Sequence, residues 1–298
     1  MALPLTETVS TDVSGIDLMP DAAVLTRVLA GQKAALDAVG AAMEPIAQAA
    51  MLMADALRGT GRLFYAAAGS SALMAMADGL ELGGTFGIDV GRIRLLMAGG
   101  LPTSAAMPGH TEDDVSEAGI AAQGIGAGDV VIAVTASGST PYACMISRLA
   151  QNAGAQTIGI ANNANAPLFD TSDVEIYLPT PPEVIAGSTR LGAATAQKAA
   201  LNMMSTLMGT HLGHVHDGMM INLVADNAKL RARAAVMVCA IAGVDEDRAR
   251  LCLEQSGGSV KLAVLFAVCP GDRWQLEQVL EKAQGNLRRA LTECGFYK

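Results

Sequence analysis

Along most of the chain, short apolar runs alternate with segments of helical periodicity, and small polar residues separate the two. The apolar runs predict strands over residues 62–67, 94–97, 130–134, 157–161 and 175–178. Helices are predicted over residues 72–82, about 114–123, 141–153 and about 190–212. Strands separated by helices of this length form βαβ units with right-handed crossovers. The pattern therefore predicts a doubly wound α/β fold, a three-layer αβα sandwich around a mainly parallel five-stranded sheet.

The two ends of the chain have a different pattern. Residues 1–20 are polar and irregular, and we expect them to form an N-terminal arm. Apolar positions at helical spacing predict a long helical region from Ala22 to about Arg58, which Pro45 should break or kink. After Val224 the chain consists of helical segments joined by Gly or Pro. We therefore expect a main domain over residues 21–224 and a helical subdomain over residues 225–298 that serves packing or a dimer.

The composition narrows the classes of function. The chain has 298 residues, 51% of them hydrophobic and 16% charged, which is ample for a large core. Its formal net charge of −9 argues against nucleic acid and against an anionic membrane surface as partners. The five cysteines form no CxxC pair, and neither a signal-peptide pattern nor an unbroken apolar run of membrane-spanning length is present. These features predict reduced thiols and a cytoplasmic protein.

One strand-to-helix turn carries candidate chemistry. The run VIAVTASGSTPY at residues 131–142 leads from a strand through a hydroxyl-rich turn into a helix that Pro141 opens. Backbone N–H groups and the positive end of a helix dipole bind anions, and hydroxyls add donors. The turn lacks the lysine of a nucleotide P-loop, which favours a small phosphate ester such as a sugar phosphate, held by Ser137, Gly138, Ser139 and Thr140. The alternative is a serine-rich turn that binds nothing.

A second turn repeats this design. The apolar run RLFYAAA at residues 62–68 ends in Gly69, Ser70 and Ser71 and continues into a strongly helix-forming segment. Ligands of open α/β sheets bind at the carboxyl edge, where two such turns can meet. The repetition favours a phosphate site that includes Ser70 and Ser71.

Longer motifs resemble a known family. Residues 183–206, EVIAGSTRLGAATAQKAALNMMST, are similar to a signature in which Glu-Val precedes Gly-Ser-Ser/Thr-Arg, Thr-Ala-Gln-Lys and Leu-Asn-Met. TASGSTPY matches that family's Ser-Gly-x-Thr-Pro-Tyr turn, LVADNAKL at residues 223–230 resembles a further segment, and Thr6-Glu7 resembles its N-terminal Thr-Glu. The chain thus resembles the sugar isomerase (SIS) domain and, more narrowly, the N-acetylmuramic acid 6-phosphate etherases.

The resemblance implies a cofactor-free lyase. Such an enzyme cleaves the lactyl ether of N-acetylmuramic acid 6-phosphate by elimination across C2–C3 and hydration, giving N-acetylglucosamine 6-phosphate and D-lactate. A base must take the C2 proton and an acid must protonate the departing lactate, and two carboxyl groups can do both. The resemblance also implies a homodimer with sites built partly across its interface. The residues it implies for phosphate and sugar binding are Ser70, Ser71, Ser137, Gly138, Ser139, Thr140, Glu183 and Ser188.

The same resemblance implies that Glu81 and Glu112 are the catalytic carboxylates. DGLE at residues 78–81, followed by TFG at residues 85–87, corresponds to the family's Asp-Ala-Ser-Glu and Thr-Tyr-Gly, and TEDD at residues 111–114 corresponds to its Glu-Asp-Ser. Each residue also has an ordinary structural interpretation. Glu81 is a solvated carboxylate at a helix end, and Glu112 is an acidic residue at a helix N-terminus.

Departures from the family pattern keep other functions open. GSSALMA stands at residues 69–75 where the family has Gly-Thr-Ser-Gly-Arg-Leu-Gly, and LGG at residues 82–84 replaces Cys-Pro-Pro. The substrate could therefore be a related sugar phosphate. An aldose–ketose sugar-phosphate isomerase is a second candidate, because it shares proton removal at C2. A sugar-phosphate-binding regulator without catalysis is a third.

Further polar residues are candidate ligands. His211, His214 and His216 could bind a metal only if the chain folds round them, and we expect solvated or interface histidines and no metal. Arg190 and Lys198 are the candidate cations near the site.

Overall fold

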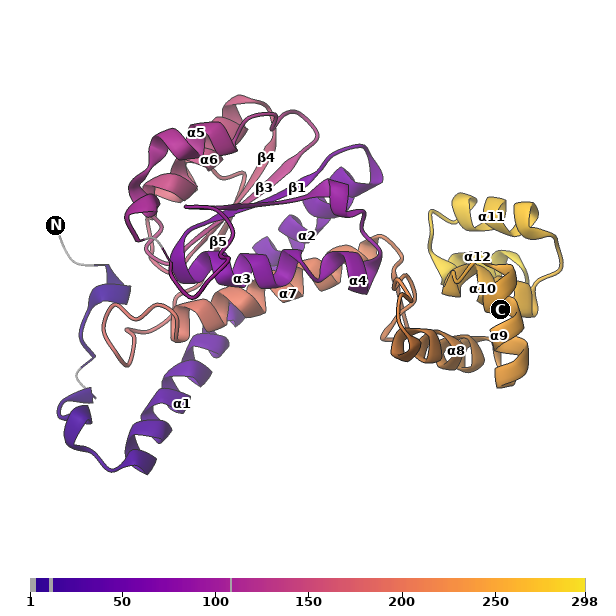
Figure 1. Cartoon of the computed structure of the whole chain (residues 1–298), viewed down its shortest axis with the longest axis horizontal. Helices are drawn as coiled ribbons and strands as arrows, with labels where there is room; N and C mark the ends of the chain where they lie inside the picture. Colours follow the sequence, from indigo (N-terminus) through magenta and orange to yellow (C-terminus); the bar gives the residue numbers. More distant parts are fainter. Residues whose placement is uncertain (1–3, 11–12, 108, 298) are drawn as a thin grey trace. The chain divides into compact units, whose positions relative to one another are not determined.

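A computed structural model of the protein describes residues 4–10, 13–107 and 109–297 (Figure 1). The chain forms two compact units. The first comprises Met1–Leu80 and Gly91–Ser205, and the second comprises Glu81–Val90 and Thr206–Lys298. The second unit thus begins before residue 225 and includes a short segment from the first half of the chain. Residues 1–3 and 11–12 of the expected arm lie outside the described residues.

A five-stranded sheet forms the centre of the first unit, and every strand pair is parallel. The order β2-β1-β3-β4-β5 and the flanking helices confirm the predicted three-layer αβα sandwich. Strands β1 and β3 are buried along their whole length, which is why their apolar runs do not alternate. The strands are β1 (Leu63–Ala67), β2 (Ile93–Met97), β3 (Val130–Thr135), β4 (Gln156–Ala161) and β5 (Val174–Tyr177).

Helices cover both faces of this sheet (Figure 1). On one face, α5 and α6 pack on the side chains of Phe64, Ala66 and Val131. The opposite face carries α2, α3 and α7. These helices are α2 (Met43–Arg58), α3 (Gly69–Gly79), α5 (Val115–Ala121), α6 (Pro141–Asn152) and α7 (Gly192–His211). Short 3-10 helices connect the elements: η1 (Leu5–Glu7), η3 (Ile16–Leu18), η4 (Val39–Ala42), η5 (Val90–Arg92), η6 (Gly109–Asp113) and η7 (Pro167–Thr171).

The N-terminal helical region is interrupted, but Pro45 is not the cause. Helix α1 (Asp21–Ala38) passes into η4 before α2 begins at Met43. Pro45 lies in the first turn of α2, where proline is tolerated because the N–H groups there have no partner within the helix. The prediction of a break at Pro45 was therefore wrong, because the interruption is the 3-10 helix η4, which ends before α2 begins.

Helix α1 leaves its apolar side chains exposed. Among its residues only Ala35 is buried. The exposed large side chains of α1 and the start of α2 are Leu25, Leu29, Leu36 and Met43. Large exposed apolar side chains of this kind are typical of interaction surfaces.

The second unit is helical and has its own core. Its helices are α4 (Leu82–Phe86), α8 (Ala228–Ala242), α9 (Glu246–Gln255), α10 (Val260–Val268), α11 (Arg273–Lys282) and α12 (Leu287–Glu293). A short antiparallel pair, β6 (Val215–His216) and β7 (Met219–Met220), precedes α8. The core includes Val238, Cys252 and Val264 from the helices and also Ile221 and Leu223. Those last two residues explain why the segment before residue 225 belongs to this unit.

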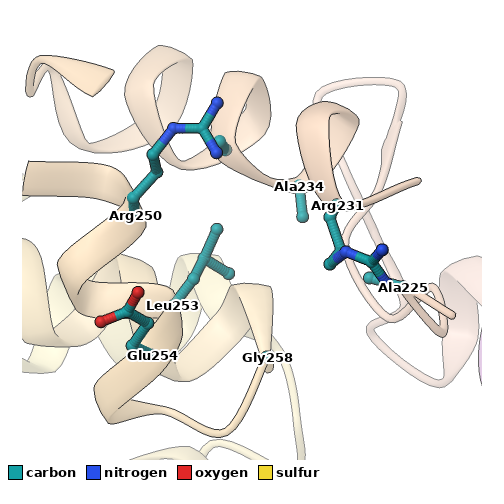
Figure 2. A pocket seen from close by; sticks show the side chains of 8 residues that line it. Ala225, Arg231, Ala234, Arg250, Leu253, Glu254 and Gly258 are labelled. Atoms are coloured by element: carbon teal, nitrogen blue, oxygen red, sulfur yellow. The ribbon is translucent and has the colours of Figure 1, made fainter. Parts of the chain in front are cut away.

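A pocket of about 260 Å³ opens between α8, α9 and the turn at Gly258 (Figure 2). Leu253 and small side chains of α8 supply its apolar part, and Arg231, Arg250 and Glu254 stand around it.

In the part of the chain that the structure describes, none of the helices meets the length and hydropathy of a membrane span by itself. The pair Glu246–Gln255 and Val260–Val268 meets them only in combination, across a bend of 117°.

Candidate active site

The hydroxyl-rich turn after β3 is held by its own side chains. The Thr135 and Thr140 hydroxyl oxygens lie 2.7 Å apart, and Ser137 Oγ accepts from the Ser139 backbone N–H at 3.2 Å. Thr140 precedes α6, whose first residue is Pro141. Ser139 is exposed and Ser137 half-buried. The turn therefore presents hydroxyls and free first-turn N–H groups at a helix N-terminus, the arrangement that binds phosphate.

Gly138 gives this turn its shape. Its φ is +76°, and a Cβ built on it would lie 2.2 Å from Ala166 Cβ. Its carbonyl accepts the Leu168 N–H at 2.9 Å, which ties the turn to the segment after β4. A glycine is required at this position by both backbone conformation and space.

The two predicted turns meet at one sheet edge. Strands β1 and β3 are neighbours, and Ala67 pairs with Val134 in register. Because the strand order reverses between these two strands, their carboxyl ends flank the switch point at which open α/β sheets bind ligands. Ser70 is half-buried and Ser71 buried in the first turn of α3.

Glu112 lies against the first of these turns. Gly69 has a φ of +54°, and a Cβ built there would be 2.7 Å from Glu112 Oε1. Burial, followed by the neighbouring charge of Asp113, raises the pKa of the Glu112 carboxyl. A carboxyl with a raised pKa is a stronger base and a more accessible acid near neutral pH. The structure thus places one of the two predicted catalytic residues at the sheet edge.

Glu81 has a different position. It belongs to the second unit, where it is exposed and immediately precedes α4. Its carbonyl accepts the Thr85 N–H at 2.9 Å. The predicted helix over residues 72–82 is in fact two helices, because α3 ends at Gly79 and α4 begins at Leu82. Glu81 therefore lies at a junction between helices.

Glu183 and Ser188 flank the start of α7. Glu183 is 3% exposed, and its two carboxylate oxygens accept the N–H groups of Gly192 and Ala193 at 2.8 Å. These bonds satisfy unpaired donors of the first helical turn. Ser188 is half-buried and follows Gly187 in the turn between Glu183 and α7. Glu183 therefore holds the backbone that carries Ser188, with both of its oxygens already engaged.

Sequence reasoning missed a buried carboxylate, Asp78. It is 2% exposed and accepts from Tyr65 Oη, Asn202 Nδ2 and Ser205 Oγ, each at 2.8 Å. Lys198 Nζ in turn donates to Asn202 Oδ1 at 2.6 Å. Burial raises the pKa of Asp78, while the three hydrogen bonds and Lys198 oppose that rise. The available signal was a lone acidic residue on an otherwise apolar helix.

The candidate cations lie beside an open pocket. The pocket measures about 320 Å³ and is lined by α7 together with Leu36 and Met74. Arg190 and Lys198 are both exposed there. Lys198 therefore connects this pocket, through Asn202, with the buried carboxylate of Asp78.

We expected solvated or interface histidines; in the structure His216 is buried, and His211 and His214 are half-buried. His216 is 4% exposed in β6, and His214 Nδ1 is buried without a hydrogen-bond partner among the described residues. Burial, followed by the charge of Lys261, lowers the pKa of His214 to about 4. Met219 and Met220 of β7 pack against the core of the second unit, and Met219 pairs with the buried His216. Within the described residues, no group of three or more His, Cys, Asp or Glu side chains is arranged to hold a metal ion.

The parallel five-stranded sheet between two layers of helices is the fold expected of a sugar isomerase (SIS) domain, and a family model identifies the same class. The SIS domain model matches residues 113–209. A phosphoheptose isomerase structure from Francisella tularensis covers 64% of this chain and 100% of its own length, at 16% identity and a TM-score of 0.49.

Full-length relatives narrow the class. An N-acetylmuramic acid 6-phosphate etherase from Deinococcus radiodurans is 38% identical over 97% of this chain and 95% of its own length. The enzyme of that name from Burkholderia lata is also 38% identical, over 97% and 94% of the two chains. The chain belongs to the family of N-acetylmuramic acid 6-phosphate etherases.

Proposed function

We propose that this chain is a carbon–oxygen lyase that cleaves the lactyl ether of N-acetylmuramic acid 6-phosphate. The products are N-acetylglucosamine 6-phosphate and D-lactate. The family membership supports the reaction, and one structural observation carries it: a partly desolvated carboxyl, Glu112, lies against the first hydroxyl-rich turn. A proton-transfer group beside an anion-binding edge is what elimination from a sugar phosphate requires.

The phosphate binds at the carboxyl edge of β1 and β3 in this proposal. Ser70 and Ser71 contact it from the first turn, and Ser137, Gly138, Ser139 and Thr140 contact it from the second. The protein's net charge of −9 repels anions, so these local donors supply the attraction. Ser188 contributes from the start of α7, and Glu183 keeps that backbone in place.

Glu81 and Glu112 divide the proton transfers. One carboxylate removes the C2 proton of the open-chain sugar, and the electron pair forms the C2–C3 double bond as the C3–O bond to lactate breaks. The other carboxyl protonates the departing lactate oxygen. Water then adds across the double bond, which restores the hydroxyl at C3 and a proton at C2.

The test is D-lactate release from N-acetylmuramic acid 6-phosphate by the parent, Glu81→Gln and Glu112→Gln. Glu281→Gln is the matched control, because it makes the same change at an exposed carboxylate of α11 to which the proposal gives no role. We expect each Gln variant to lose on the order of 10²- to 10⁴-fold in kcat while it still binds N-acetylglucosamine 6-phosphate. Full activity in either variant contradicts that residue's role. Ketose phosphate without lactate would instead select an isomerase, and binding without turnover would select a regulator.

The chain acts as a homodimer in this proposal, and the apolar side chains exposed on α1 support it. Leu25→Lys combined with Leu29→Lys should shift the mass measured by light scattering from dimer to monomer. An unchanged mass would remove α1 from the interface. A cytoplasmic location fits the five free cysteines.

A further inference from the structure

The N-terminal segment Leu5–Glu7 is attached to the carboxyl edge of the sheet. Thr6 is 1% exposed, although its neighbours Leu5 and Glu7 are exposed. The Leu5 backbone N–H donates to Asn163 Oδ1 at 2.7 Å, and Asn163 Nδ2 donates to Thr6 Oγ1 at 3.2 Å. A residue near the chain terminus is therefore as well buried as the strands.

The same asparagine also holds the hydroxyl-rich turn. Asn163 follows β4 and is 8% exposed. Its Nδ2 donates to the Ala136 carbonyl at 2.9 Å, and Ala136 directly precedes Ser137. One side-chain amide thus joins Thr6 to the start of the turn that would bind phosphate.

The backbone of Thr6 is bonded to the turn that carries Ser188. The Thr6 carbonyl accepts the Gly187 N–H at 3.0 Å. Gly187 has a φ of +73°, and a Cβ built there would lie 2.9 Å from Glu7 Oε2. The segment Leu5–Glu7 therefore contacts Gly187, the residue before Ser188.

We propose that Thr6 is a positioning residue of the sugar-phosphate site, which holds the Ser188 turn at a fixed distance from the Ser137–Thr140 turn. The inference rests on the proposed function, because it deepens the account of that same site. A ligand that contacts both turns gains affinity only while their spacing is kept, and small displacements of positioning groups are costly. The hydroxyl of Thr6 fixes one side of this connection and its carbonyl fixes the other.

The decisive comparison is Thr6→Val with Thr6→Ser. Valine has nearly the shape of threonine but leaves Asn163 Nδ2 without this acceptor, whereas serine keeps the hydroxyl. Thr8→Val is the matched control, because the Thr8 hydroxyl donates to the Leu5 carbonyl within the same segment and, among the described residues, not to Asn163 or Gly187. If Thr6→Val does not fold, Asn163→Asp replaces it, since this change removes the N–H donor to both Thr6 and Ala136 while keeping the acceptor for Leu5.

The measurements are the Kd of N-acetylglucosamine 6-phosphate, and KM and kcat for lactate release. We expect Thr6→Val to raise Kd and KM about tenfold with a smaller change in kcat, the size of effect that one lost hydrogen bond produces. Thr6→Ser should restore parent values, and Thr8→Val should not differ from the parent. Parent-like Kd and KM in Thr6→Val, or equal effects in Thr8→Val, overturn the inference.

The two proposals fail differently. A parent protein that binds N-acetylglucosamine 6-phosphate but releases no lactate refutes the proposed reaction, while the Kd series still tests Thr6. If the parent releases lactate and Thr6→Val leaves Kd and KM unchanged, only the positioning role is refuted. A parent that neither binds the sugar phosphate nor releases lactate overturns both.

Discussion

Gly138 is the position where a single methyl group should damage the candidate site most directly. Its backbone is left-handed, with φ +76°, and a side chain there costs about 1–2 kcal/mol in backbone energy alone. The added Cβ would also lie 2.2 Å from Ala166 Cβ and 3.2 Å from Ala161 Cβ. Relieving such overlap in a packed region typically costs about 1–3 kcal/mol. Gly138→Ala should therefore reduce the free energy of unfolding by about 2–5 kcal/mol.

A second glycine separates the two contributions. Gly124 has a similar φ of +82°, but a Cβ there would meet no atom within 4 Å. Gly124→Ala should therefore show the backbone cost alone, about 1–2 kcal/mol. Urea unfolding of both variants gives the difference, which reports the overlap with Ala166. N-acetylglucosamine 6-phosphate binding should weaken in Gly138→Ala and stay unchanged in Gly124→Ala.

The result that would refute this reasoning is equal destabilisation in the two variants. In that case the segment carrying Ala166 yields without cost, and the turn is not held in the way the contacts indicate. If Gly138→Ala is destabilised but binds the ligand as the parent does, the proposed phosphate contacts do not depend on the shape of this turn.

Two further predictions concern pH. Burial raises the folded-state pKa of Asp78 above its ordinary value of 3.8, so the native state holds this proton more tightly than the unfolded state. The stability contributed by Asp78 is therefore largest at low pH and is lost as the pH rises through the folded pKa. In urea unfolding of Asp78→Asn, the free energy of unfolding should lack this decline with rising pH. A decline equal to that of the parent would contradict the assignment. For His214, whose pKa falls from 6.5 to about 4, the unfolded state takes up the proton first as the pH drops. The free energy of unfolding should fall between pH 6.5 and 4 by at most about 3 kcal/mol. Urea unfolding of His214→Gln should show a flatter profile over this range, and a fall as steep as in the parent would contradict the role of His214.

Much of the fold follows from local pattern. Strands β1 and β3 are continuous apolar runs bounded by small residues, and the parallel sheet follows from their alternation with helices. Helix α7 was also expected close to its observed bounds, and the chain after Val224 was expected to be helical, as it is in α8 to α12. Local pattern was less informative where apolar content continued across a break, as between α3 and α4, because the residues at a helix end remain compatible with helix.

The candidate site was predicted only in part. The two turns and their meeting at one edge were expected, since a hydroxyl-rich turn after each of two parallel strands must lie at the carboxyl edge. The burial of His216 was not expected, because the residues around it are too few and too mixed to show a periodic pattern. Asp78 was noted only as part of a motif, although it is buried and accepts three side-chain hydrogen bonds.

The sequence by itself determined which segments are strands and helices, where the hydroxyl-rich turns fall, and the family to which the motifs point. Only the tertiary structure decided which distant residues share those turns: Glu112 beside Gly69, Asn202 and Ser205 on Asp78, and Thr6 on Asn163. The physical reason is that hydrophobic periodicity records whether a side chain is buried but not against which partner. A hydrogen bond such as that between Thr6 and Asn163, 157 residues apart in the chain, exists only after the sheet has assembled and brought its strand ends together.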